Sequence, residues 1–141
     1  MKALEYIFDD MLIGKEATYD YIISDKVYLG YIEISGDVSP IHINSEVAIT
    51  SGFKERVMHG GILNAFISHF IGMVFPGKNG LLLSVDIRFN NPSYMWDALR
   101  VTGKISKRSE SLSVIEIQIV INNITQNAQA ASGKALVKLC A

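Results

Sequence analysis

The amino-acid sequence predicts an α+β fold in which an antiparallel sheet wraps around one long, apolar central helix. Residues 57–77 contain no Asp, Glu, Lys or Arg, which is typical of a buried helix. From residue 81 onward, apolar and polar side chains alternate as they do in strands with one face on a core. The late strands follow one another through short turns, which favours antiparallel pairing. We therefore expect residues 1–141 to form a single domain around one core.

The central helix is predicted from about Gly61 to Phe75. The uncharged run is nearly as long as a membrane span, but it contains two histidines and several small residues and ends at Pro76. A helix that is apolar on almost every side and shorter than a membrane span is usually buried in a protein core. The sequence therefore predicts a core helix and no membrane association.

Alternation predicts four strands after this helix. In the first, one face carries Leu81, Leu83, Val85, Ile87 and Phe89, and Asn90-Asn91-Pro92 ends the strand. Residues 99–106 and 114–121 form the next two, separated by a break at residues 109–111. Asn122 and Asn123 begin a turn, and residues 131–139 form the last strand. These strands account for most of one sheet.

The first third of the chain predicts one strand and two short helices. Residues 17–23 alternate as a strand, and Ser24-Asp25 is expected to cap a helix that runs to about Ile34. Ser45 is expected to cap another helix, from Glu46 to about Ser51. This strand would make the sheet one of four or five strands.

Composition excludes several classes of function. With 13 basic and 14 acidic residues the net charge is −1, and no basic tract is present to bind nucleic acid or an anionic membrane surface. The single cysteine, Cys140, has no partner for a disulfide and no neighbours at metal-ligand spacing. Acidic residues interrupt the N-terminal segment where a signal peptide needs an apolar run, so we expect a cytoplasmic protein.

The stretch SGDVSPIHIN, residues 35–44, places a carboxylate and an imidazole five residues apart. Pro40 and the neighbouring Gly predict that Asp37 and His42 lie in one loop and not on a helix. Ile41 and Ile43 flank His42, so we expect the imidazole to point away from two buried side chains. Such a pair could perform general acid–base chemistry, but the same residues also make an ordinary solvated turn.

The start of the central helix carries a second candidate feature. Gly60 and Gly61 would present main-chain N–H groups that have no partner within the helix, at the positive end of its dipole. These donors suit an oxygen that acquires negative charge, such as a thioester carbonyl. The alternative is that the glycines only permit a close approach of chain to chain.

A polar line is expected along the same helix. Gly60, Asn64 and Ser68 recur every four residues and share one face. We expect Asn64 and Ser68 to be buried, so that their side chains form hydrogen bonds with the neighbouring strands or contact the Asp37 loop or a ligand. His59 and His69 are ten residues apart, so they cannot form a metal pair, and we interpret both as packing residues. The sequence predicts neither a metal site nor a nucleotide cofactor.

In this order, SGDVSPIH, VMHGGIL and LSVDIRFNNP resemble the MaoC-like, (R)-specific enoyl-CoA hydratases. The resemblance extends from about Leu12 to the end of the chain. It implies the hot-dog fold, in which an antiparallel sheet wraps around a long helix. It also implies reversible addition of water to a trans-2-enoyl thioester of CoA or acyl carrier protein, giving an (R)-3-hydroxyacyl thioester. No cofactor is implied beyond the pantetheine of the substrate.

The resemblance assigns roles residue by residue. Asp37 and His42 would be the catalytic pair that activates water, and the Gly60 N–H would stabilise the thioester oxygen. Ser68 matches a serine near the catalytic aspartate, and Asn44 matches a position that braces the loop. The family also implies a homodimer or higher homo-oligomer, with the pantetheine arm in a groove near the subunit boundary.

The sequence departs from the family pattern in two places. Ser39 stands where many members have Asn, and it keeps a small hydrogen-bonding side chain. Trp96-Asp97 stands where the family often has Gly-Asp, which would reshape the neighbouring turn. Two other functions stay open: a hot-dog thioesterase, which the lack of an acidic residue on the central helix disfavours, and an acyl-binding or interaction subunit without turnover.

Overall fold

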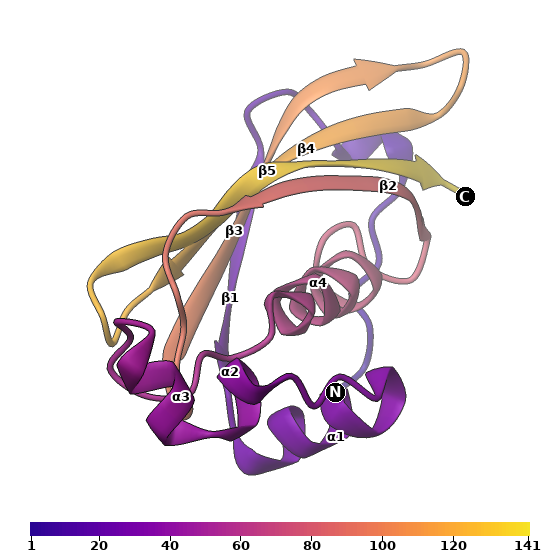
Figure 1. Ribbon diagram of the computed structural model, residues 1–141. Helices are drawn as coiled ribbons and strands as arrows, with labels where there is room; N and C mark the ends of the chain where they lie inside the picture. The colour runs from indigo at the N-terminus through magenta and orange to yellow at the C-terminus, as the bar shows by residue number, and fades with distance from the viewer.

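The computed structural model describes residues 1–141 as a five-stranded antiparallel sheet curled over one central helix, α4 (Gly60–His69) (Figure 1). The strand order is β1-β3-β4-β5-β2. The strands are β1 (Glu16–Ile22), β2 (Gly80–Phe89), β3 (Ala98–Ser109), β4 (Val114–Asn123) and β5 (Ala128–Leu139). The predicted α+β fold with an antiparallel sheet around an apolar helix is confirmed.

Three short helices lie near the N-terminal end of α4 (Figure 1). They are α1 (Asp25–Ser35), α2 (Pro40–Ile43) and α3 (Ser45–Thr50). A separate 3-10 turn, η1 (Phe8–Asp10), precedes β1. After α4 the helix continues as a π-helical segment, η2 (Phe70–Val74). The two segments together run from Gly60 to Val74, close to the predicted helix from Gly61 to Phe75.

The core lies between α4 and the concave face of the sheet. Ile62, Ile67 and Phe70 are buried on the helix, and the alternate isoleucines of β4 are buried opposite them. Burial of each such side chain contributes about 1.5–3 kcal/mol, so this interface dominates the stability of the fold. Among the described helices, the long apolar segment included, we find none with the length and hydropathy needed to span a membrane.

The predicted faces of β2 are wrong in its first half. A bulge between Leu82 and Ser84 shifts the register against β5, so Leu82 is half-buried while Leu81 and Leu83 are 54% and 51% exposed. A single extra residue moves the following side chains to the other face of a sheet. Alternation read from the sequence as one unbroken series therefore assigned the two leucines to the wrong side.

The helix caps and strand ends differ from expectation in detail. Ser24 caps α1 as predicted, because its hydroxyl accepts a hydrogen bond from the Val27 N–H. The cap of α3 is Asn44 and not Ser45, since the Asn44 side chain accepts from the Val47 N–H. Asn122 and Asn123 were expected to begin a turn, but they are the last two residues of β4, and Asn123 is buried.

Candidate functional site

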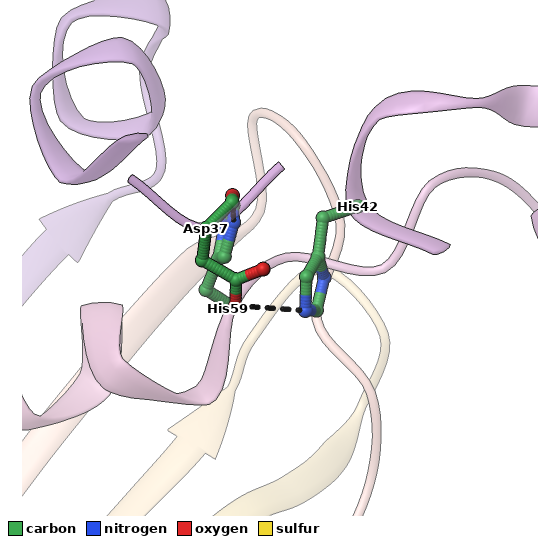
Figure 2. A group of neighbouring side chains, drawn as sticks. All are labelled: Asp37, His42 and His59. Atoms are coloured by element: carbon green, nitrogen blue, oxygen red, sulfur yellow. Dashed lines mark hydrogen bonds and ion pairs between the residues drawn. The ribbon is translucent and has the colours of Figure 1, made fainter. Parts of the chain in front are cut away.

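Asp37 and His42 lie side by side at the beginning of α4. The distance from Asp37 Oδ2 to His42 Nε2 is 3.8 Å, and the two side chains are 41% and 18% exposed (Figure 2). Asp37 is in the loop between α1 and α2, but His42 lies on the single helical turn α2, which begins at Pro40. The prediction that both residues share one loop is therefore wrong for His42. Proline favours the first position of a helix, and here it starts the turn that carries the imidazole.

The flanking isoleucines do not orient His42 as expected. Ile41 is half-buried and Ile43 is 44% exposed, so neither is fully buried against the core. The orientation comes instead from His42 Nδ1, which lies 2.6 Å from the Val57 carbonyl oxygen. Because a carbonyl only accepts, Nδ1 carries the proton in the neutral ring and Nε2 presents its lone pair toward Asp37.

Ser39 holds the other oxygen of the Asp37 carboxylate. Asp37 Oδ1 accepts hydrogen bonds from the Ser39 hydroxyl at 2.6 Å and from the Ser39 N–H at 3.0 Å. These two bonds, the hydroxyl bond above all, lower the pKa of Asp37, and the nearby His42 and His59 rings add to the effect. Asp37 is therefore an ionised acceptor whose Oδ2 faces His42 with no other partner in the chain.

His59, interpreted from sequence as a packing residue, belongs to this site. It is 2% exposed, its ring stacks on that of His42 with 4.0 Å between centroids, and its Nε2 lies 2.8 Å from the Asp37 carbonyl oxygen (Figure 2). The sequence signals were its place directly before Gly60 and within the motif VMHGGIL, and neither revealed a contact with a residue 22 positions earlier.

Gly60 and Gly61 form the first turn of α4, and no side chain caps their N–H groups. Both glycines are also required by close packing. A Cβ at Gly60 would lie 2.9 Å from the Phe89 ring, and one at Gly61 would overlap the Tyr31 hydroxyl. Both interpretations that the sequence left open therefore apply. The glycines allow the Phe89 and Tyr31 rings to approach closely, and their N–H groups remain available as donors at the positive end of the helix.

A cavity of about 310 Å³ opens beside His42 and Gly60. Its wall is formed by Ile23, His42, Phe53, Leu63 and residues 57–60 and 89–93. Most of the exposed lining is apolar, with polar groups at His42, His59 and the asparagines that follow β2. Ligand cavities in proteins are commonly of this kind, mostly apolar with a few polar groups at one end.

The segment after β2 that lines this cavity is held by a buried carboxylate. Asp97 is 2% exposed and accepts hydrogen bonds from the Tyr94 N–H, the Asn123 amide and the Gln126 amide. The Ser93 carbonyl in turn accepts from the Met58 N–H, next to His59. Asp97, noted in the sequence only as part of a departure from the family pattern, thus supports one wall of the site.

The other predicted site residues are more dispersed. Asn64 and Ser68 are exposed on α4, which contradicts the expectation that they are buried, and Ser68 lies roughly 12 Å along the helix from Gly60. Asn44 braces the segment after His42 by capping α3. Asn64 and Ser68, four and eight residues after the half-buried Gly60, thus form an exposed line that leads away from the Asp37–His42 pair.

Histidine is a common metal ligand, and the three histidines of the chain lie in two places: His42 and His59 lie next to Asp37, and His69 lies next to Tyr21. Asp37, His42 and His59 offer ligand atoms within 4.8 Å of one another, but His42 Nδ1 and His59 Nε2 already meet carbonyl oxygens. Lone pairs of imidazole lie in the ring plane, so two stacked rings do not direct them at one point between the rings. His69 pairs separately with the Tyr21 hydroxyl at 2.8 Å, where burial raises the pKa of Tyr21.

The MaoC like domain model matches residues 15–127. The chain belongs to the MaoC-like domain family. The family inferred from SGDVSPIH and VMHGGIL is therefore confirmed, and with it the hot-dog fold that the resemblance implied.

Similar proteins include two (R)-specific enoyl-CoA hydratases. The one from Aeromonas caviae is 25% identical over 90% of this chain and 94% of its own length. The one from Rhodospirillum rubrum is 29% identical over 69% of this chain and 67% of its own length. The solved structure of R-Hydratase PhaJ1 from Pseudomonas aeruginosa superposes with a TM-score of 0.88 at 26% identity, covering 97% of this chain and 87% of that one.

Proposed function

We propose that this chain catalyses the reversible addition of water to a trans-2-enoyl thioester, giving an (R)-3-hydroxyacyl thioester. The observation that carries the proposal is the open pair of acceptors, Asp37 Oδ2 and His42 Nε2, beside the uncapped start of α4. Membership of the MaoC-like family and the hydratases among its relatives support the same reaction class, which the sequence predicted. The enzyme is thus a lyase that acts as hydratase or dehydratase according to substrate supply.

The geometry suits one water molecule held between the pair. Both facing atoms are acceptors, because Asp37 is ionised at neutral pH and the Val57 carbonyl directs the proton of His42 to Nδ1. A water molecule has two O–H donors, so it can donate one to each and direct an oxygen lone pair outward. That lone pair would attack the β-carbon of the bound enoyl group.

The two residues divide the proton transfer. A carboxylate with a lowered pKa is a weak base, so His42 Nε2 takes the proton from water as the new C–O bond forms. Asp37 orients the water and stabilises the imidazolium that results. His42 then returns this proton to the α-carbon, so that one water is added across the double bond and both side chains regain their starting states.

Gly60 supplies the electrostatic part of the reaction. Attack at the β-carbon moves negative charge onto the thioester oxygen, and an N–H at the helix start stabilises that charge. The Gly60 N–H is uncapped and lines the same cavity as His42. We assign Asn64 and Ser68, on the same exposed face, to substrate binding, and Ser39 and Asn44 to support of the loop.

Substrate and partners follow from the same proposal. The thioester is carried on CoA or on acyl carrier protein, no further cofactor takes part, and the reaction occurs in the cytoplasm. The chain forms a homodimer through β2, a ten-residue edge strand with exposed Leu81 and Leu83. The pantetheine arm would then lie near this boundary, along the exposed line on α4. Light scattering of wild type and Leu83→Lys tests the dimer, since the variant is expected to be monomeric.

The experiment that tests the reaction is loss of the ultraviolet absorbance of crotonyl-CoA. Wild type is expected to hydrate the substrate, and Asp37→Asn and His42→Ala are each expected to lower kcat by about 100-fold or more. Asp20→Asn, a substitution at an exposed aspartate on β1, is the matched control and should retain full activity. Full turnover by both site variants would overturn the assignment of the pair.

The two alternative functions have their own readouts. Release of free thiol from acyl-CoA would indicate a thioesterase, although residues 60–74 carry no acidic side chain. Tight binding of acyl-CoA without product over a long incubation would indicate a binding subunit. The ionised, accessible Asp37 next to His42 favours the enzyme over both.

A further inference from the structure

We infer that His59 is a positioning residue of this site, which holds the main chain at Asp37 with one nitrogen and the plane of the His42 ring with its face. The inference rests on the proposed hydration and extends it to a third side chain. His59 lies directly before Gly60, so the same residue also joins the acid–base pair to the first turn of α4.

The bond to Asp37 ties an exposed loop to the core. His59 is 2% exposed, and its Nε2–H donates to the Asp37 carbonyl oxygen at 2.8 Å. The other hydrogen bonds of Asp37 are local, with Ser35 and Ser39. The His59 bond is therefore the one hydrogen bond that joins Asp37 to a residue distant in the sequence. Without it, the loop would carry the carboxylate with little restraint.

The stacked rings restrain His42 in a second direction. The His42 Nδ1–H donates to the Val57 carbonyl in the plane of the ring, while His59 packs against the ring face at 4.0 Å between centroids and 28° between planes. One contact fixes rotation within the plane and the other fixes the tilt. Together they aim Nε2 at Asp37 Oδ2, 3.8 Å away.

The surroundings of His59 favour a functional role over simple packing. Its Nδ1 is buried without a hydrogen-bond partner, which costs free energy that an apolar ring of similar size would avoid. Tyr28 and Tyr31 flank the ring with centroids 5.9 and 4.9 Å away, so its own orientation is well defined. The one hydrogen bond made by its side chain goes to the residue that carries the catalytic carboxylate.

Two substitutions separate the two contacts. His59→Phe keeps an aromatic face for His42 but removes the donor to Asp37, whereas His59→Gln keeps an amide donor but removes the ring. His69→Phe and His69→Gln are matched controls, because His69 lies on the same helix and is hydrogen-bonded to Tyr21 away from the pair. Turnover is measured well below the Tm of each variant, so that only folded protein is compared.

We expect both His59 variants to lower kcat by about 10- to 100-fold, as misplaced catalytic groups do, with KM within about threefold of wild type. The His69 controls should retain kcat within about threefold of wild type by the same measure. Retention of wild-type kcat by both His59 variants would overturn the inference. An equal loss in the His69 controls would also overturn it, because the effect would then be structural.

A measurement that needs no turnover distinguishes failure of this inference from failure of the proposed function. The chain has three histidines, so nitrogen NMR can assign the protonated nitrogen of each ring. We expect the proton of His42 at Nδ1 and that of His59 at Nε2, and a change at His42 in both His59 variants. If wild type shows no hydration but these signals hold, the proposed reaction fails and the positioning stands. Other tautomers, or an unchanged His42 signal, would overturn the positioning itself.

Discussion

Two aspartates at the same end of the molecule are used in opposite ways. Asp97 is buried, and its two oxygens accept three hydrogen bonds, from the Tyr94 N–H and the amides of Asn123 and Gln126. Asp37 is 41% exposed, and Ser39 occupies one oxygen while the other faces His42 across 3.8 Å. One carboxylate is saturated by the protein and the other retains an open acceptor.

The two carboxylates therefore differ in what they can do: that of Asp97 stabilises the fold, whereas that of Asp37 is available for chemistry. A buried carboxylate must be fully hydrogen-bonded, and once it is, it holds the surrounding segments in one arrangement. A carboxylate with a free oxygen beside an imidazole can instead bind and orient water. Asp97 holds Tyr94 in place, and the preceding residues 89–93 form a wall of the cavity that His42 also lines.

The largest effect is expected from Asp97→Ala. It leaves the Tyr94 N–H and the Asn123 and Gln126 amides without their shared acceptor, so we expect about 3 kcal/mol of lost stability. For a chain of this length that corresponds to a fall in Tm of about 10 °C, measured by calorimetry at fixed protein concentration. Asp20→Ala, which removes an exposed aspartate paired with Arg100, should cost less than about 1 kcal/mol. Equal costs at the two positions would contradict the comparison.

The substitution Asp37→Asn should separate activity from stability. Its side chain is exposed, so the free energy of unfolding should stay close to that of wild type. The amide cannot replace an ionised acceptor beside His42, so kcat in the crotonyl-CoA assay should fall by about 100-fold. A marked loss of stability would mean that Asp37 is structural in the same sense as Asp97.

Ser39→Ala tests whether Ser39 lowers the pKa of Asp37. Hydrogen bonds from Ser39 lower the pKa of Asp37 below its ordinary value of 3.8, and the variant loses the hydroxyl bond, the largest cause. Its pKa should rise toward that value, as followed by carbon NMR of the carboxyl group. In wild type the lowered pKa stabilises the fold above the ordinary value, and this contribution disappears as pH falls through the lowered one. Activity at neutral pH should fall by about fivefold or less. An unchanged pKa would show that the Ser39 hydroxyl does not lower the pKa of Asp37.

Gln126→Ala should give the smallest effect. It removes one of the three donors to Asp97 and leaves the buried Asn123 bond at 2.6 Å in place. We expect a loss of about 1 kcal/mol and unchanged kcat, from chemical denaturation and the crotonyl-CoA assay. A loss as large as that of Asp97→Ala would show that the outermost bond of the network, and not the buried one, carries its stability.

Much of the fold could be predicted because its signals are local. Alternation located β3 and β4, and the charge-free run located α4 and η2, since a strand or helix that faces a core repeats its apolar residues with a fixed period. The register of β2 could not be predicted in this way. Its bulge at Leu82/Ser84 depends on pairing with β5, about fifty residues later.

The residues of the site were also predictable only where the sequence signal was local. Asp37 and His42 are five residues apart in the sequence and were identified together, as was Gly60 at the helix start. His59 was interpreted as a packing residue, because its contacts with Asp37 and His42 cross 22 and 17 positions of the chain. Asn64 and Ser68 were expected to be buried, since nothing in the sequence shows that the sheet leaves this face of α4 uncovered.

The sequence by itself determined the family, the α+β architecture and the carboxylate–imidazole pair, because periodicity and short motifs are written in neighbouring residues. Only the tertiary structure decided which Asp37 oxygen is free, which His42 nitrogen carries the proton, and that His59 and Asp97 support the site. Each of these depends on hydrogen bonds between residues far apart in the chain, from His42 to Val57, from His59 to Asp37 and from Asn123 to Asp97. Such partners meet only when the sheet has curled around α4.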